Sequence, residues 1–353
     1  MSLRGPIRRR AGRCRAAPPA DRPRAGRGID HVPSRAADAP AGGLAGADAT
    51  LPAELLTAQP PVIVVVGPTG IGKTSVAFEL AQRLNGEVVV ADSRQVYQML
   101  DIATNKPSPE QRQRIHYHMI DFVDPKLTFN AAQYVERARA AVDDIMGRGK
   151  VPIVEGGTML YVDALTEGFS LAGVPPNAQL RRQLELLDAS AMRQRLLTLD
   201  PDPGVDLQNP VRMIRAIELL EAVGPPLRQL RQRKAPPWPV ARVGLLARLD
   251  VIDRRLAERS RSQVARGLIA ETQAALDAGV PASAAVLTGI GYAEALAHLR
   301  GEVTLEDLPD VMAASNRRYA RRQMRWWRRD VRIRWFEIEP DPVPAILNYV
   351  ESN

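Results

Sequence analysis

The chain reads VIVVV at residues 62–66 and continues with GPTGIGKT at residues 67–74. The first segment consists of β-branched apolar residues, which predicts a buried strand, and the second fits the pattern G-x-x-x-x-G-K-[ST]. A helix is expected next, because small and apolar residues recur on one helical face, namely Ala77, Leu80, Ala81 and Leu84. A strand, a glycine-rich loop and a helix in this order predict a phosphate-binding loop (P-loop), which does not by itself identify the reaction.

The P-loop is expected to bind a di- or triphosphate mainly through its backbone. Its glycines let successive N–H groups point into one concavity at the start of a helix. Lys73 adds a mobile positive charge, and Thr74 supplies a hydroxyl for a Mg2+ ion. The predicted phosphate-binding residues of the loop are Gly67, Pro68, Thr69, Gly70, Ile71, Gly72, Lys73 and Thr74, with Thr74 as the metal ligand.

Two further predicted strands should end beside the P-loop. The strand over Glu87–Ala91 leads into Asp92, and the strand over Lys150–Val154 leads into the turn Glu155–Thr158. In a parallel α/β sheet, ligands bind at the carboxyl ends of the strands. Asp92 can orient Mg2+ through water, accept a proton from a substrate, or cap a helix. Thr158 places a hydroxyl at the same edge, although Gly-Gly-Thr is also an ordinary strand-to-helix turn.

Length and composition indicate a globular protein with room for two domains. Of the 353 residues, 45% are hydrophobic and 25% are charged. The longest apolar run, residues 61–66, is far shorter than the roughly 18 residues that a membrane-spanning helix needs. The single cysteine, Cys14, excludes an internal disulfide and favours a reducing compartment. We therefore expect a soluble, cytoplasmic protein.

The N-terminal segment is expected to be a disordered extension. Residues 1–60 hold ten arginines, five acids and eight prolines, which gives a net charge of +5. Their few apolar residues cannot offset the entropy lost on ordering. An organellar transit peptide and a non-native extension upstream of the true start are the alternatives, and the acids and prolines argue against the transit peptide.

A second basic segment lies near the C-terminus. Residues 312–335 hold nine arginines against the single acid Asp330, a net charge of +8. The arginines from Arg317 onward recur at i, i+1, i+4, i+5 and i+8, which places them on one stripe of a helix. Met312, Tyr319 and Trp326 can face the core from the other side. The stripe is either a solvated helix face or a surface for a polyphosphate such as nucleic acid, and like-charge repulsion favours the second.

The region between the third strand and the C-terminal half is predicted to be helical. Charged amphipathic runs punctuated by proline pairs extend over residues 170–243. We therefore expect an α/β fold, in which a P-loop NTPase-like parallel sheet is flanked by helices and carries an inserted all-helical domain and a helical C-terminal part. The expected domains are a core of residues 61–170 and 244–340, an inserted domain of residues 171–243, and a tail of residues 341–353.

Several motifs, in a fixed order, resemble the tRNA dimethylallyltransferase (IPP transferase) family. They are GPTGIGKT at 67–74, ADSRQVY at 91–97, DIATNKP at 101–107, HYHMID at 116–121, EGGTMLY at 155–161 and RRYARRQMRWW at 317–327. The resemblance covers roughly residues 62–335. The chain departs from the family pattern at Ala103 and Asn105 and lacks an arginine that the family usually has near residues 249–253. His116 and His118 are interpreted as structural, because no third ligand appears at metal-site spacing.

The resemblance implies transfer of a dimethylallyl group from dimethylallyl diphosphate to N6 of adenosine 37 in the tRNA anticodon loop. Lys73, Thr74 and Mg2+ would stabilise the leaving diphosphate. By the same resemblance, Asp92 would take the proton of the adenine amine and Thr158 would hydrogen-bond near the transferred group.

Arg255 and Arg259 are implied as further diphosphate contacts. They lie four residues apart on the helix predicted from about Val251 to Gly267 and therefore share a face. Ion pairs with Asp253 or Glu258 are the alternative role for them.

The resemblance also implies a flipped target base and an inserted domain that grips the anticodon stem of the tRNA. The partners are then tRNA and dimethylallyl diphosphate, with no membrane, and we expect a monomer. The tRNA-binding residues implied by position are Asp92, Ser93, Arg94, Gln95, Arg212, Arg215, Gly291, Tyr292, Arg317, Arg318, Arg321, Arg322 and Gln323.

Three rival functions use the same motifs differently. A P-loop kinase for a small molecule would use Asp92 as a base on a hydroxyl but leaves the arginine stripe without a role. An isopentenyltransferase for free adenine nucleotides would need no large basic surface. An RNA-binding module without catalysis would not need Asp92 or Thr158.

Overall fold

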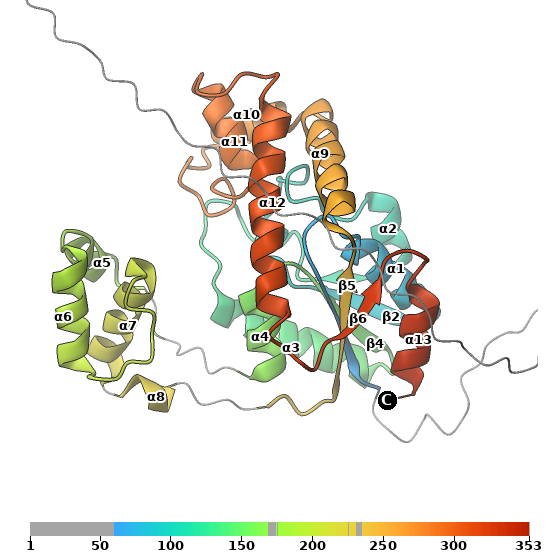
Figure 1. Cartoon of the computed structure of the whole chain (residues 1–353), viewed down its shortest axis with the longest axis horizontal. Coiled ribbons are helices and arrows are strands. Elements are labelled where there is room, and N and C mark those ends of the chain that lie inside the picture. The colour runs from blue at the N-terminus through green and yellow to red at the C-terminus, as the bar shows by residue number, and fades with distance from the viewer. Residues whose placement is uncertain (1–59, 169–173, 175, 225, 231–234, 353) are drawn as a thin grey trace, which may run out of the picture. The chain divides into compact units, whose positions relative to one another are not determined.

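Six parallel strands form one sheet in the computed structural model, which describes residues 60–168, 174, 176–224, 226–230 and 235–352. Their order in the sheet is β3-β2-β4-β1-β5-β6, and each neighbouring pair is parallel (Figure 1). The predicted α/β fold with a parallel sheet is confirmed. The strands are β1 (Val62–Val66), β2 (Gly86–Val90), β3 (Tyr117–His118), β4 (Val151–Glu155), β5 (Val240–Leu246) and β6 (Arg334–Glu337).

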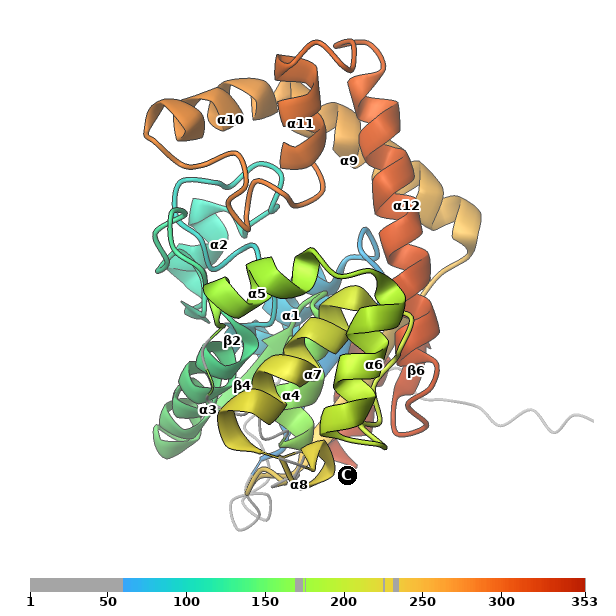
Figure 2. The same ribbon diagram turned by 90° about the vertical axis from the view of Figure 1, so that its left-hand side faces the viewer.

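Helices cover both faces of the sheet and extend beyond its carboxyl edge (Figures 1 and 2). On the faces lie α1 (Lys73–Arg83) with α13 (Val343–Glu351), and α3 (Ala131–Gly147) with α4 (Met159–Glu167). The short helix α2 (Pro109–Arg114) precedes β3. A helical layer beyond the carboxyl ends of the strands consists of α9 (Leu249–Ala265), α10 (Leu268–Asp277), α11 (Tyr292–Leu299) and α12 (Leu308–Trp327).

Two hydrophobic clusters stabilise this part of the chain. The larger cluster is centred on β1, whose five residues are at most 1% exposed because the strand lies between β4 and β5 and under helices on both faces. The smaller cluster joins α10, α11 and the first half of α12 to the loop after β2, where Val96, Tyr97 and Leu100 are buried. The loop after β2 is therefore anchored to the helices that lie beyond the sheet edge.

Helix α12 buries a different face from the one expected. Met312 is fully buried, but Tyr319 and Trp326 are only half-buried. The buried seam runs instead through residues that include two polar side chains and follow the 3.6-residue period, namely Met312, Ala313, Asn316, Ala320, Gln323 and Trp327. The prediction was wrong for two reasons. Residues seven apart drift around a straight helix, and a search for hydrophobic residues passes over Asn316 and Gln323 because they are polar.

The inserted region folds around a core of its own. It consists of α5 (Ala178–Glu185), α6 (Ala189–Leu199), α7 (Pro210–Val223) and α8 (Leu227–Leu230), and its cluster includes Leu184, Leu196 and Ile217. Within it, the buried carboxylate of Glu218 accepts hydrogen bonds from Arg181 at 2.7 Å and Arg215 at 3.2 Å. These hydrogen bonds outweigh the burial of Glu218 and lower its pKa to about 2, so the carboxylate stays charged.

The C-terminal segment differs from the expected domain boundary. The expected tail, residues 341–353, contains α13, whose Val343, Ile346 and Val350 pack into the larger cluster, so this segment belongs to the core. The expected disordered extension falls on residues outside the described ranges, which begin at residue 60. Across the described ranges, no helix combines the length and the apolar content that crossing a membrane requires.

Candidate active site

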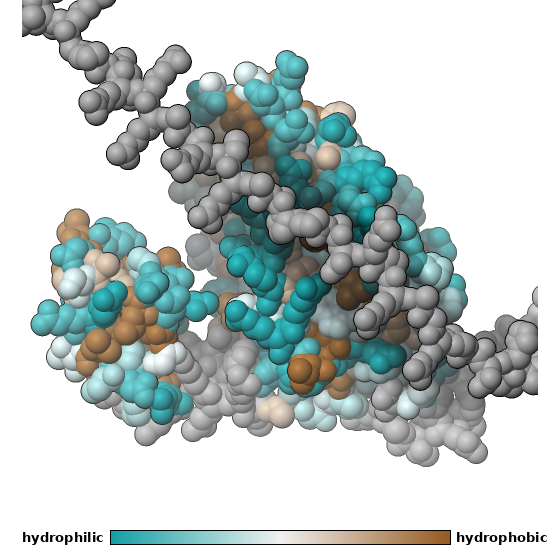
Figure 3. All heavy atoms as spheres, in the orientation of Figure 1, coloured by the Kyte–Doolittle hydropathy of each residue, from teal (hydrophilic) through white to brown (hydrophobic). Residues whose placement is uncertain are grey.

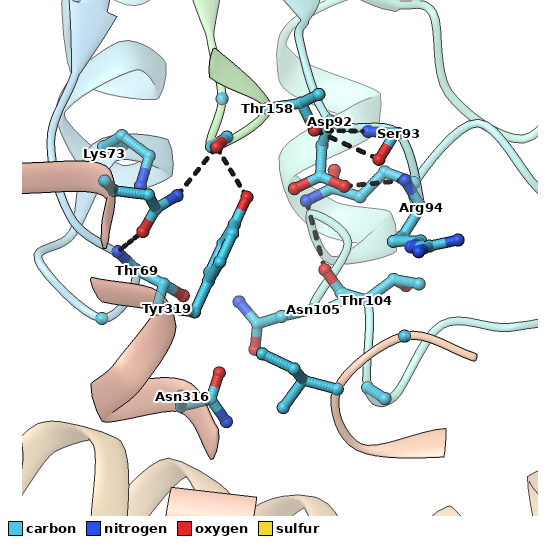
Figure 4. Close-up of a pocket in the computed structure, with 18 of the residues that line it drawn as sticks. Thr69, Lys73, Asp92, Ser93, Arg94, Thr104, Asn105, Thr158, Asn316 and Tyr319 are labelled. Carbon is cyan, nitrogen blue, oxygen red and sulfur yellow. Dashed lines mark hydrogen bonds between the residues drawn. The ribbon is translucent and has the colours of Figure 1, made fainter. Parts of the chain in front are cut away.

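One cavity of about 620 Å3 opens at the carboxyl edge of the sheet. Its walls come from the P-loop, from the segments that follow β2 and β4, from the loop before α11, and from α9 and α12. Figure 4 shows Lys73, Asp92, Thr158 and Tyr319 around this cavity, each supplied by a different segment of the chain. The structure therefore brings the P-loop and both predicted catalytic residues into one site.

The P-loop holds the ammonium of Lys73 against its own backbone. Lys73 Nζ donates hydrogen bonds to the carbonyl oxygens of Gly67 at 3.2 Å and Pro68 at 3.1 Å. Gly72, with φ of 104°, provides the left-handed turn from which α1 begins. Burial lowers the pKa of Lys73 to about 8, against the opposing effect of the nearby acids Glu155 and Asp92. An ammonium has three hydrogens, so one remains for a ligand in the cavity.

Glu155, which the site prediction left out, lies on the floor of the cavity. It ends β4, is 2% exposed, and accepts a hydrogen bond from the Thr74 hydroxyl at 3.2 Å. Burial raises the pKa of Glu155 to about 7, and the charge on Lys73 acts in the opposite direction. The sequence does contain a signal for this residue, because Glu155 is an acid that ends an otherwise apolar strand expected beside the P-loop.

The ends of β2 and β4 are joined closely enough to fix Asp92 and Thr158. A Cβ atom on Gly156 would lie 2.2 Å from the carbonyl oxygen of Ala91, so the two backbones approach as only glycine allows. Oδ1 of Asp92 accepts the N–H of Arg94 at 2.8 Å, which leaves Oδ2 for the cavity (Figure 4). The Thr158 hydroxyl accepts the N–H of Ser93 at 2.9 Å and so ties the segment after β2 to the start of α4.

Helix α12 links the P-loop to the turn after β4. The amide of Gln323, which is fully buried, accepts the N–H of Thr69 at 2.8 Å and donates to the carbonyl oxygen of Gly157 at 2.8 Å. Tyr319 donates its hydroxyl to the same carbonyl oxygen at 2.8 Å. Gln323, predicted as a tRNA contact, therefore has both ends of its amide engaged in holding two cavity walls together.

The two predicted arginines of α9 take different positions. Arg259 lines the cavity and donates to the Thr69 hydroxyl at 3.1 Å and to Asn316 Oδ1 at 3.0 Å. Burial lowers the pKa of Arg259 to about 10, against the opposing effect of the nearby acid Asp92. Arg259 forms no salt bridge with any residue that the structure describes, so its charge is available to an anion in the cavity. Arg255 does not line the cavity; it donates to the carbonyl oxygen of Ile71 at 3.2 Å and braces the loop from outside.

The predicted tRNA-binding residues divide into those that line the cavity and those that do not. In addition to Asp92 and Gln323, the cavity is lined by Ser93, Arg94, Gln95, Tyr292 and Arg322. Tyr292 donates its hydroxyl to Glu271, and the N–H of Ala103 donates to that hydroxyl at 3.3 Å, so Tyr292 also anchors the loop after β2. Outside the cavity lie Arg212, Arg215, Gly291, Arg317, Arg318 and Arg321.

The basic segment presents arginines on the outer side of α12, where Figure 3 shows hydrophilic side chains. Arg318, Arg321 and Arg322 are exposed, and Arg317 is half-buried. Part of the charge is neutralised within the protein, because Arg332 pairs with Asp330 and Glu167, and Arg321 lies 3.8 Å from Asp253. The net charge of this segment therefore overstates what is available to a polyphosphate.

A separate cluster that can hold a metal ion is formed by residues of β2, of β3 and of the position just before β3. Glu87, His116 and His118 offer ligand atoms that all lie within 4.8 Å of one another. The third group comes from a neighbouring strand, which spacing along the chain could not reveal. Hydrogen bonds from Arg148 and Lys150 already neutralise the Glu87 carboxylate and, with the bond from His118, hold its pKa well below the usual range.

Comparison with known proteins identifies the family. The sequence profile of the IPP transferase family matches residues 95–330. A tRNA dimethylallyltransferase from Thermomicrobium roseum is 41% identical over 284 residues, which are 79% of this chain and 86% of the relative. One from Geobacter metallireducens is 39% identical over 298 residues, which are 82% of this chain and 96% of the relative.

Solved structures agree with the sequence relatives. The tRNA isopentenylpyrophosphate transferase from Bacillus halodurans matches with a TM-score of 0.64 and 32% identity, covering 83% of this chain and 96% of that chain. A eukaryotic dimethylallyltransferase acting on tRNA matches with a TM-score of 0.70 and 26% identity, covering 82% and 78% respectively. The resemblance in the motifs, the sequence relatives and the fold agree, and this chain belongs to the tRNA dimethylallyltransferase (IPP transferase) family.

Proposed function

We propose that this chain transfers a dimethylallyl group from dimethylallyl diphosphate to N6 of adenosine 37 in the anticodon loop of tRNA. The observation that carries the proposal is the placement of the P-loop and of Asp92 in one cavity. A diphosphate on the P-loop and an amine at Asp92 can then meet between them. A tRNA substrate supports a cytoplasmic location for the proposed reaction.

The diphosphate is bound by the cationic side of the cavity. Lys73 and Arg259 line that side, and backbone N–H groups at the start of α1 add partial positive charge. These groups stabilise the negative charge that develops on the diphosphate as the carbon–oxygen bond breaks. The Thr74 hydroxyl lines the cavity beside carboxylate oxygens, which is the oxygen-donor chemistry that Mg2+ prefers. Bound there, Mg2+ would neutralise further charge on the leaving group.

The amine is activated from the opposite side. As N6 forms its bond to the allylic carbon, it loses a proton, and Oδ2 of Asp92 is the acceptor. The diphosphate leaves with the electron pair of the broken carbon–oxygen bond, so charge and atoms balance. Thr158 positions Asp92 in this scheme, because its hydroxyl holds Ser93.

The target base reaches the cavity only if it leaves the anticodon stack. Arg94, Gln95 and Arg322 line the cavity beside Asp92 and are the proposed contacts for the flipped nucleotide. Arg317, Arg318 and Arg321 on α12 are the proposed phosphate contacts. The exposed Arg212 on the inserted helical region is a further proposed contact for the anticodon stem.

Label transfer tests this function. Incubated with Mg2+ and labelled dimethylallyl diphosphate, the protein should label unmodified tRNA but not AMP. Replacing the target adenosine with guanosine should abolish transfer, because guanosine lacks the N6 amine. Transfer to AMP at comparable efficiency would support the free-nucleotide rival, and phosphorylation of a small acceptor by ATP without RNA would support the kinase.

The arginines of α12 should govern the salt dependence of tRNA binding. We expect the double variant Arg317→Ala with Arg321→Ala to bind tRNA more weakly. The slope of log affinity against log salt concentration should become shallower by about 2, because each arginine would account for one phosphate contact. The Asp253 partner of Arg321 is partly exposed, so its loss should cost little stability. Arg83→Ala with Arg137→Ala, exposed arginines of α1 and α3, should leave the slope unchanged. An unchanged slope in the α12 variant would exclude this surface as the RNA contact.

A further inference from the structure

Glu155 differs from the other buried acids of the described residues in the hydrogen-bond partners of its carboxylate. Glu87 and Glu218 accept hydrogen bonds from arginines, and Asp200 accepts two backbone N–H groups. Glu155 accepts one hydrogen bond through its side chain, from the hydroxyl of Thr74, and forms no ion pair with any residue of the described ranges. A buried acid with so few partners lacks compensation for its lost hydration.

We propose that Glu155 is the carboxylate of the metal site, holding Mg2+ together with Thr74 when a diphosphate is bound. This inference rests on the proposed binding of a diphosphate to the P-loop. It adds a metal-holding residue to a site for which the sequence predicted Thr74 as the direct ligand.

The position of Glu155 in the sheet supports this role. In the register of the sheet, Glu155 lies opposite Val65 on β1 and Val90 on β2. It is therefore located between the strand that leads into the P-loop and the strand that leads into Asp92. Its carboxylate lines the cavity beside Thr74 and Lys73. P-loop NTPases hold Mg2+ with the hydroxyl of the loop and an acid placed at the end of a nearby strand. Glu155 provides that second group here.

The hydrogen bond between Thr74 and Glu155 also orients the hydroxyl. A hydroxyl has one hydrogen and two lone pairs, and the hydrogen of Thr74 is donated to Glu155. The lone pairs are then free to face a cation in the cavity. Glu155 therefore acts on the metal both as a negative charge and through the orientation of its ligand.

The charges on the floor of the cavity couple the binding of the diphosphate to the binding of the cation. Lys73 Nζ is bonded to the carbonyl oxygens of Gly67 and Pro68, not to Glu155. A diphosphate without a cation would meet the buried acid of Glu155, which repels it. A divalent cation between them turns this repulsion into attraction, so Glu155 should oppose binding of the bare anion and favour binding of its Mg2+ complex.

Calorimetry on the full chain with inorganic pyrophosphate and Mg2+ tests the proposal. In Glu155→Gln, which keeps the size of the side chain, the affinity of the pyrophosphate-bound protein for Mg2+ should fall at least about tenfold, while the affinity for pyrophosphate without metal should be unchanged or higher. Thr74→Val should lose Mg2+ affinity in the same way. Glu136→Gln removes an exposed acid of α3 and should change neither affinity.

Two outcomes would overturn the proposal. Wild-type Mg2+ affinity in Glu155→Gln would remove Glu155 from the metal site, and loss of metal-free pyrophosphate binding in the same variant would contradict the repulsion between Glu155 and the bare anion. Thermal melts of each variant establish that it is folded. If the wild-type protein binds pyrophosphate and Mg2+ but does not modify tRNA, the proposed function fails while the metal site stands; if it binds neither, the diphosphate site itself fails.

Discussion

Asp92→Asn should lower kcat for transfer to tRNA at least about a hundredfold, the usual contribution of a general base. The amide oxygen of asparagine can still accept the N–H of Arg94, which Oδ1 of Asp92 accepts at 2.8 Å, so the side chain should keep its place. An amide cannot take the proton that N6 loses. The expected change is therefore in kcat, measured in single-turnover reactions with both substrates bound, and not in the Kd for tRNA.

The control for Asp92→Asn is Asp277→Asn, which removes an exposed acid at the end of α10 and should leave kcat unchanged. Asp92→Ala, which also breaks the bond to Arg94, should lose as much activity or more. Retention of activity within about tenfold in Asp92→Asn would show that another group takes the proton.

Lys73→Met should lower kcat/KM for dimethylallyl diphosphate by about a hundredfold to a thousandfold, the scale for losing one group that stabilises developing charge. Methionine keeps much of the length of the side chain but removes its charge. It also removes the third ammonium hydrogen, which is available to a ligand because the other two are donated to the carbonyl oxygens of Gly67 and Pro68. The affinity for pyrophosphate should fall in parallel, whereas the Kd for tRNA should not change. Steady-state kinetics with varied diphosphate and a separate tRNA-binding assay measure the two effects.

Lys126→Met, at an exposed position before α3, removes the same charge away from the cavity and should leave kcat/KM unchanged. If Lys73→Met instead weakened tRNA binding and left pyrophosphate binding intact, the P-loop would serve the RNA, not the leaving group. The proposed division between an anion side and an acceptor side of the cavity would then be wrong.

Local rules were enough to predict one half of the site. β-branched residues before a glycine-rich loop fix the strand and the loop that follows it, and the carboxyl ends of parallel strands share an edge. Asp92 and Thr158 could therefore be placed beside Lys73 without any knowledge of side-chain packing. The strands β2 and β4 begin and end within one residue of the predicted positions.

The other half of the site depends on helix docking, which local rules do not reach. Gln323 meets Thr69 across 254 residues of sequence, and its polar side chain sits in the buried seam of α12 where a hydrophobic pattern gives no signal. Arg255 and Arg259 share a helical face in the sequence, but only the docking of α9 decides that Arg259 enters the cavity. Glu155 is a different case, because an acid that ends an apolar strand beside the P-loop is a local signal, although the site prediction does not include this residue.

The connection from β4 to β5 has a consequence for synthesis on the ribosome. Val62–Val66 pairs with β4 on one side and with β5 on the other, yet β5 is translated only after the inserted helices. Until Val240–Leu246 emerges, an entirely apolar central strand has one open edge, which is the kind of edge that recruits other chains. The nascent enzyme therefore keeps this edge open for as long as its inserted helices are being translated, and a ribosome-associated chaperone that covers the edge should act during that interval.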